Sequence, residues 1–127
     1  MEEKFKELAG LFVSQMAESG VQLGYDAPSV EWADGFVERQ RARFTGGEEA
    51  GLVNVVGAFL GECVIASYGG RWRADGGAWA VYFDDSHAAD PFSKVQKQFD
   101  NGREGGDSIY SFYTLIPVLF KRASDAQ

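Results

Sequence analysis

The amino-acid sequence predicts an α+β fold, in which four or five helices lie around a central apolar helix and pack against a small antiparallel β-sheet. Three observations lead to this prediction. Apolar residues recur at helical spacing up to residue 68, alternate with polar residues across residues 71–84, and return to helical spacing after residue 90. The chain has 127 residues, of which 45% are hydrophobic, so it can bury the core of one domain spanning residues 1–127.

The first two helices are predicted from apolar stripes and from residues typical of helix ends. The first stripe precedes Gly20, a natural helix stop, and the second follows Ser29, which we expect to cap the helix start. The first stripe consists of Phe5, Leu8, Phe12 and Met16, and the second of Trp32, Phe36, Val37, Gln40 and Phe44.

The third helix is the most apolar and is predicted to be central. Thr45 and Glu48 have the T-x-x-E spacing of a capping box, so the helix should begin there, and Gly69 should end it. Gly57 and Gly61 lie one turn apart at the flank of its apolar face, a spacing that lets another backbone approach inside a soluble domain. That broad face consists of Leu52, Val55, Val56, Phe59, Leu60, Cys63 and Val64.

Glu62 is an acidic residue in the middle of this apolar helix. It shares a narrow stripe with Asn54 and Ala58, on the side away from the main apolar face. A carboxylate at such an edge prefers a partner, which we expect to be an arginine of the second helix, or Arg71 or Arg73. We therefore interpret Glu62 as a structural polar anchor. The alternative, a general base in a pocket, lacks a histidine or second acid in the segment.

Residues 71–84 are predicted to form a β-hairpin. Alternation places Trp72 on one face of the first strand and Trp79 on one face of the second, and the sequence DGG between them is a turn signal. With Asp75 and Gly76 at the central turn positions, the two tryptophans would lie opposite each other. Because a two-stranded sheet is marginal alone, its apolar face must lie on the helices.

The loop that follows holds the single histidine and several acids, namely Asp84, Asp85, His87 and Asp90. Such side chains suit a divalent metal, but their spacing matches neither an EF-hand loop nor a zinc motif. Each has a simpler role, since the first two acids end the strand and Asp90, followed by Pro91, can cap the next helix. We expect no metal site here, and no motif predicts a cofactor.

The C-terminal part carries two further helical patterns. A short helix should begin after Asp90 and stop at residues 100–102, and Asp107 should cap the last helix. Pro117 should kink or end that helix because proline lacks a backbone donor. Since residues 109–116 are rich in aromatic and β-branched side chains, a strand stays an open alternative there. The two stripes consist of Phe92, Val95 and Phe99, and of Ile109, Phe112, Tyr113, Ile116 and Phe120.

Charge and the motifs argue against several functional classes. With 12 basic and 19 acidic residues the formal net charge is −7, which repels nucleic acid and anionic membrane surfaces. No segment is an uninterrupted membrane span and the N-terminus does not have the pattern of a secretory signal, so we expect a cytoplasmic protein.

Cys63 is the single cysteine and lies on an apolar helix face. The sequence has no nucleophile elbow, P-loop or dinucleotide fingerprint, so no catalytic constellation is recognisable.

Four short blocks carry a resemblance to a protein family. GAFLGECVIASYGGRW, GGAWAVYF, DPFSKVQKQFDNG and DSIYSFY follow one another between residues 52 and 116. In this order they resemble a family of small bacterial domains of unknown function. The resemblance supplies no catalytic residues, and within its pattern Glu62, Trp72 and Asp107 would be architectural. In size and charge alone, the chain also resembles the immunity proteins that neutralise bacterial toxins.

The sequence therefore predicts a protein that acts by binding another protein. Tyr82, Asp84, Asp85 and Asp90 are candidate contacts on an aromatic-centred, acid-rimmed surface, which would suit a basic partner such as a toxin or effector. The alternative is a small-ligand-binding protein or a small enzyme that uses Glu62 together with the aspartate loop. The oligomeric state stays open.

Overall fold

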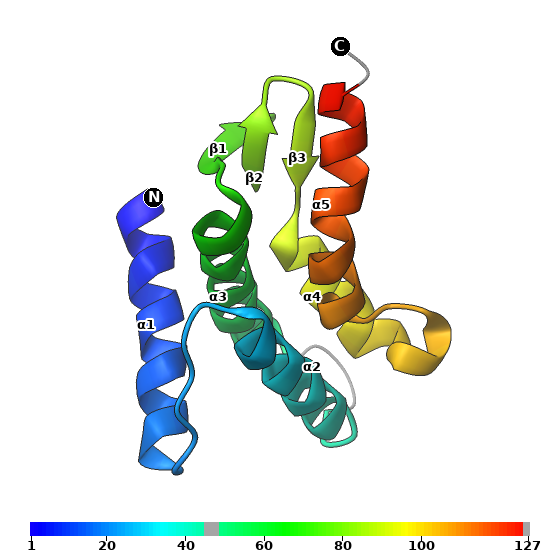
Figure 1. Ribbon diagram of the computed structural model, residues 1–127. Helices are drawn as coiled ribbons and strands as arrows, with labels where there is room; N and C mark the ends of the chain where they lie inside the picture. Colours follow the sequence, from blue (N-terminus) through cyan, green and yellow to red (C-terminus); the bar gives the residue numbers. More distant parts are fainter. Residues whose placement is uncertain (45–48, 126–127) are drawn as a thin grey trace.

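The computed structural model describes residues 1–44 and 49–125, with side chains up to Leu119 (Figure 1). Over these residues the fold is α+β, as predicted, with five α-helices, a short 3-10 helix and a three-stranded antiparallel sheet. The capping box predicted for Thr45 and Glu48 lies outside the described residues. The elements are α1 (Glu2–Glu18), α2 (Ala27–Arg41), α3 (Ala50–Tyr68), β1 (Arg71–Asp75), β2 (Ala78–Asp84), β3 (His87–Ala89), α4 (Pro91–Asn101), η1 (Arg103–Gly105) and α5 (Ile109–Asp125).

Helix α3 is central. It contacts all four other α-helices and strand β2, and α1 runs along one side of it (Figure 1). Because α3 is surrounded in this way, the predicted stripe of Asn54, Ala58 and Glu62 does not lie together outside the core. Asn54 is exposed and Glu62 is half-buried, but Ala58 between them is fully buried. By length and composition α3 is apolar enough to cross a membrane, but half of that segment is buried inside the fold. The same composition is expected of the core helix of a soluble protein.

Aromatic side chains, and not a second backbone as predicted, pack against Gly57 and Gly61. A Cβ atom at Gly57 would lie 2.4 Å from the ring of Phe92, and one at Gly61 would lie 2.3 Å from the ring of Trp72. Both rings also meet Phe5 of α1, with centroid distances of 5.3 Å for Phe92 and 4.3 Å for Trp72. The two glycines therefore let α4 and the sheet dock on α3 through aromatic rings.

The first hairpin turns one residue later than predicted. Gly76 and Gly77 occupy the central turn positions with φ of +61° and +85°, and positive φ at both positions is what a type I′ turn requires. Trp72 consequently lies opposite Val81 and not opposite Trp79. The partner of Trp72 has moved by two residues along β2. Because side chains alternate between faces with a period of two, both tryptophans keep their predicted face.

Strand β3 lies where the sequence predicted a loop. It pairs antiparallel with the end of β2, and a bulge interrupts the pairing between Tyr82 and Asp84. A histidine and two alanines carry no strong strand preference, so the pattern of this segment alone did not indicate a strand. The segment becomes a strand because it pairs with the edge of β2 that β1 leaves open.

Two helix caps differ from those predicted. Asp26, and not Ser29, caps α2, because its side chain accepts a hydrogen bond from the backbone N–H of Ser29 at 3.1 Å. Ser108, and not Asp107, precedes α5, and its hydroxyl accepts from the backbone N–H of Ser111 at 3.1 Å. In both cases the cap lies three residues before the N–H that it satisfies, as capping geometry requires.

Residues 109–116 are helical and do not form a strand, the alternative that the sequence left open. Helix α5 continues through Pro117 to Asp125 and does not end at the proline. Proline removes one backbone donor, but the helix tolerates this loss.

Candidate functional site

Three of the four predicted contact residues lie together at the end of β2. Tyr82, Asp84 and Asp85 line one pocket of about 290 Å³, which Arg71 and Arg73 also line. The guanidinium of Arg73 lies 4.6 Å from the ring centroid of Tyr82 and pairs with Asp85 at 2.8 Å. This surface therefore carries both signs of charge.

The remaining acids of this region are engaged separately. Asp84 accepts a hydrogen bond from the backbone N–H of Ser86 at 2.8 Å and lies 2.8 Å from Nδ1 of His87. The hydrogen bond with His87, followed by that from Ser86, lowers the pKa of Asp84. Asp90 caps α4, as predicted, by accepting from the backbone N–H of Ser93 at 3.0 Å. Within the described parts of the chain, no three His, Cys, Asp or Glu side chains gather as a metal site requires.

Glu62 has a partner that the sequence did not predict. Its Oε2 accepts a hydrogen bond from the indole N–H of Trp72 at 2.7 Å. The expected partners Arg71 and Arg73 flank this tryptophan on β1, and successive side chains of a strand point to opposite faces, so the arginines face away from α3. The contact ties α3 to β1. Glu62 is not among the residues that line the pocket of Tyr82.

Cys63, next to Glu62, is fully buried in the core. Burial raises the pKa of its thiol, and the charges of Asp26 and Glu62 raise it further. A thiol in this environment stays protonated and is not a nucleophile.

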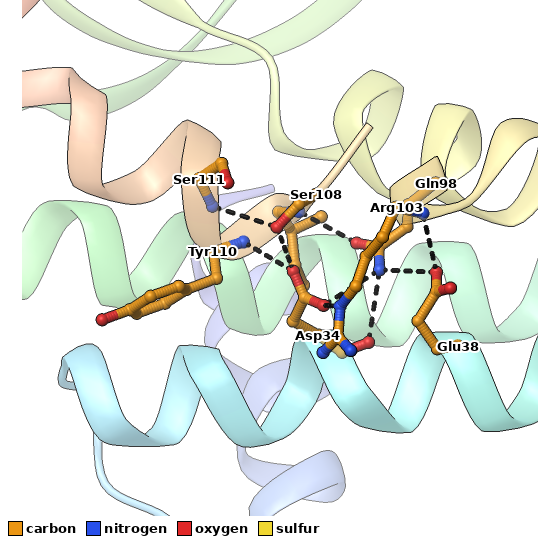
Figure 2. Close-up of polar contacts among 8 residues, drawn as sticks. Asp34, Glu38, Gln98, Arg103, Ser108, Tyr110 and Ser111 are labelled. Carbon is orange, nitrogen blue, oxygen red and sulfur yellow. Dashed lines mark hydrogen bonds and ion pairs between the residues drawn. The ribbon is translucent and has the colours of Figure 1, made fainter. Parts of the chain in front are cut away.

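A buried polar cluster surrounds Asp34 of α2. Asp34 is 1% exposed, and its carboxylate accepts four hydrogen bonds from other elements (Figure 2). The donors are the hydroxyl of Ser108, the backbone N–H of Tyr110 at 3.0 Å, Nε of Arg103, and Nε2 of Gln98 at 3.2 Å. Figure 2 shows the ring of Tyr110 pointing away from the carboxylate, so only its backbone takes part. One side chain of α2 thus gathers α4, η1 and α5.

Gln98 of α4 extends the cluster. It is fully buried, and its Nε2 also approaches Oε2 of Glu38 at 2.9 Å and the backbone oxygen of Asp34 at 3.2 Å. Its Oε1 accepts from the backbone N–H of Ile109 at 2.9 Å. In the part of the chain that the structure describes, every buried side-chain nitrogen or oxygen has a hydrogen-bond partner. A fully satisfied polar network of this kind is rigid and specifies how the helices meet.

The surroundings of Asp34 keep it ionised. Burial on its own raises the pKa of a carboxyl group, but the hydrogen bonds from Ser108, Tyr110 and Arg103 outweigh that effect, so the pKa of Asp34 is lowered. A general base needs a pKa close to the working pH and access to the proton that it removes. The buried, fully bonded Asp34 therefore holds the fold together, and its contacts do not suit acid–base chemistry.

Sequence reasoning missed Asp34 because it centred the apolar face of α2 to one side of the buried face. Val37 is fully buried, as predicted, whereas Trp32 and Phe36 pack against the core but are only half-buried. The buried face consists of Ser29, Val30, Ala33, Asp34 and Val37. The signal was present in the sequence, since an acid among small apolar residues at helical spacing needs a buried partner.

Helix α5 has two apolar faces, of which only one is covered by the described residues. The buried face consists of Ile109, Tyr113 and Ile116. The other face, which we name the outer stripe, consists of Leu115, Val118 and Leu119, exposed to 50%, 51% and 58%. Residues three and four apart are neighbours on a helix, so the stripe is continuous. Phe112, one turn earlier, is half-buried, and the ammonium of Lys94 lies 5.4 Å from its ring centroid.

No family model, no curated protein and no solved structure matches this chain. The resemblance to a bacterial domain family therefore stays a prediction, and the functional argument rests on the residues themselves.

Proposed function

We propose that the protein acts by binding a protein partner, and that the outer stripe of α5 forms the centre of the interface. The observation that carries this proposal is the exposure of Leu115, Val118 and Leu119 to half or more, side by side on one helix. Contiguous exposed apolar side chains are typical of interaction surfaces, and a helix face of this kind suits an apolar groove. The pocket of about 200 Å³ between Lys94, Phe112, Leu115 and Leu119 would accept one side chain of the partner.

The chemistry of the partner follows from charge. A net charge of −7 attracts a basic protein at long range and accelerates its association. In this proposal Tyr82, Asp84, Asp85 and Asp90 supply polar contacts outside the apolar centre. The concrete form that we favour is a cytoplasmic immunity-type protein, a class that the chain resembles in size and charge, which neutralises a basic toxin or effector. Its support is the size and acidity of the chain together with the outer stripe.

The experiment compares a double leucine variant of the outer stripe with a single leucine variant outside it. The tagged protein is used to recover a partner from the source cells, and the affinity of that purified partner is then measured by calorimetry. Leu115→Ser combined with Leu119→Ser should weaken binding by at least roughly tenfold, because each removes apolar area from the centre of the interface. Leu11→Ser is the matched control, since Leu11 is 45% exposed on α1 and outside the stripe. Equal affinities of the stripe and control variants would contradict the proposal.

The immunity-type form has its own test. A toxin gene directly upstream, and growth of cells that express this toxin only when they also express the protein, would support it. A recovered partner whose contact surface is net acidic would contradict the role given to charge.

A further inference from the structure

Two arginine side chains end over the same glycine on the surface of α2. A Cβ atom at Gly35 would lie 3.1 Å from Nη1 of Arg39 and 3.7 Å from Nη2 of Arg103, and no other described side chain comes within 4 Å of that position. Gly57 and Gly61 make room for aromatic rings of the core. At Gly35, by contrast, the two guanidinium groups are the only described side-chain groups that occupy this space.

Both guanidinium groups are held in place by neighbouring side chains. Nε of Arg103 pairs with the buried carboxylate of Asp34, while the arginine side chain itself is 50% exposed. The guanidinium of Arg39 lies over the ring of Trp32, 5.2 Å from its centroid. Among the described residues, no hydrogen bond involves the terminal nitrogens of either arginine, although the charge of Arg103 is paired with Asp34. Donors that are held in place but unused are preorganised for a ligand.

The two terminal groups are close enough to share one ligand group. Two nitrogens at these distances from one point lie within about 7 Å of each other. The ion pair with Asp34 offsets the charge of Arg103, so repulsion between the two arginines is small. An oxyanion that reaches both guanidinium groups would accept charge-assisted hydrogen bonds from both.

We propose that Arg39 and Arg103, with the bare backbone of Gly35 between them, bind the oxyanion of a small ligand, a phosphate or carboxylate group. A pocket of about 540 Å³, of which Arg103 forms part of the lining, has room for the rest of the ligand. It is lined by Glu31, Asp34, Arg103, Ser108, Tyr110 and Ser111. Glu31 and the ionised Asp34 would repel a second anionic group, so the ligand carries its negative charge at one end and a neutral or cationic part at the other. None of the three outer-stripe residues lines this pocket, although it shares Ser108 and Ser111 with the pocket beside the stripe.

The test uses inorganic phosphate in one titration and acetate in another, at constant ionic strength set with sodium chloride. Binding is followed through the NMR signals of the Gly35 amide and of Nε–H of Arg103. The site predicts a saturable shift with phosphate, with acetate or with both, and the comparison identifies the preferred oxyanion. Shifts that rise linearly without saturation for both probes would overturn the proposal.

Three variants distinguish a specific anion-binding site from nonspecific attraction of anions to positively charged side chains. Arg39→Gln should weaken binding by at least roughly tenfold, since it removes charge-assisted hydrogen bonds. Gly35→Ala should weaken binding without lowering the melting temperature, because alanine favours the helix and its Cβ, 3.1 Å from Nη1 of Arg39, displaces only that guanidinium from its place. Arg71→Gln is the matched control, as it removes one positive charge from an exposed position of β1. Equal affinities of Arg39→Gln and Arg71→Gln would overturn the proposal.

Discussion

At the scale of single residues, the hydrogen bond between Glu62 and Trp72 predicts a measurable loss of stability. Glu62→Ala leaves the indole N–H of a tryptophan that is 4% exposed without its acceptor, so the free energy of unfolding should fall by about 1–3 kcal/mol. Glu62→Gln retains an acceptor oxygen and should lose less. Urea denaturation followed by tryptophan fluorescence measures both variants. An unchanged urea midpoint for Glu62→Ala would show that this contact does not anchor the hairpin.

A second residue-scale prediction concerns the pH dependence that Asp34 confers. Its pKa is lowered in the folded state, so its contribution to stability is complete above the ordinary aspartate pKa of about 3.9 and is lost as the pH falls through the lower folded value. Asp34→Asn should therefore destabilise the protein at neutral pH, on the order of 3 kcal/mol. The difference from the wild type should shrink only below about pH 4.

Urea unfolding of both proteins at a series of pH values measures this difference. Glu104→Gln is the control, because Glu104 is exposed and its replacement should leave the unfolding free energy nearly unchanged. If the cost of Asp34→Asn does not change down to the acid limit of the folded protein, the carboxylate is not the source of this stability.

At the scale of whole elements, the docking of the sheet on α3 depends on the absence of a side chain at one position. A Cβ atom at Gly61 would lie 2.3 Å from the ring of Trp72 and 3.3 Å from Pro91, so Gly61→Ala forces β1 or α4 away from α3. We expect a loss of about 1–3 kcal/mol. Gly10→Ala in α1 is the matched control, since nothing lies within 4 Å of a Cβ there, and it should stabilise the helix by up to about 1 kcal/mol. Thermal unfolding followed by circular dichroism compares the two, and a rise in melting temperature for both would contradict the packing argument.

At the scale of the whole molecule, the net charge of −7 predicts how binding responds to salt. The Debye length falls from about 8 Å at physiological ionic strength to about 3 Å at 1 M, so raising the salt should slow association with a basic partner and change dissociation much less. Asp84→Lys with Asp85→Lys changes the net charge by two units at each position, from −7 to −3, and should also slow association. Stopped-flow kinetics measure these rates.

The control for this prediction has the same net charge but a different location. Glu18→Lys with Glu104→Lys also gives −3, at two exposed acids on α1 and η1. A larger effect of the Asp84 and Asp85 pair would place the partner near the end of β2. Association that is indifferent to salt and to both double variants would contradict a basic partner.

Features that depend on residues close together in the sequence could be predicted, whereas long-range pairings could not. The spacing of apolar residues in a helix or strand, and the capping of a helix, depend on residues only a few positions apart. The sequence therefore predicted the α+β class, the central α3, the faces of the first hairpin and the cap at Asp90. Local reasoning failed where two neighbouring residues could serve equally, as at Asp26 and Ser29, or Ser108 and Asp107.

By itself, the sequence determined the elements, their buried faces in most cases, and an acidic surface charge. Only the tertiary structure decided the partners. Glu62 meets Trp72 because the alternation of β1 turns the arginines outward, and Asp34 is buried because α4, η1 and α5 converge on α2. The two arginines over Gly35 come from segments 64 residues apart. Such pairings depend on which faces meet after folding, and no spacing along a single chain encodes them.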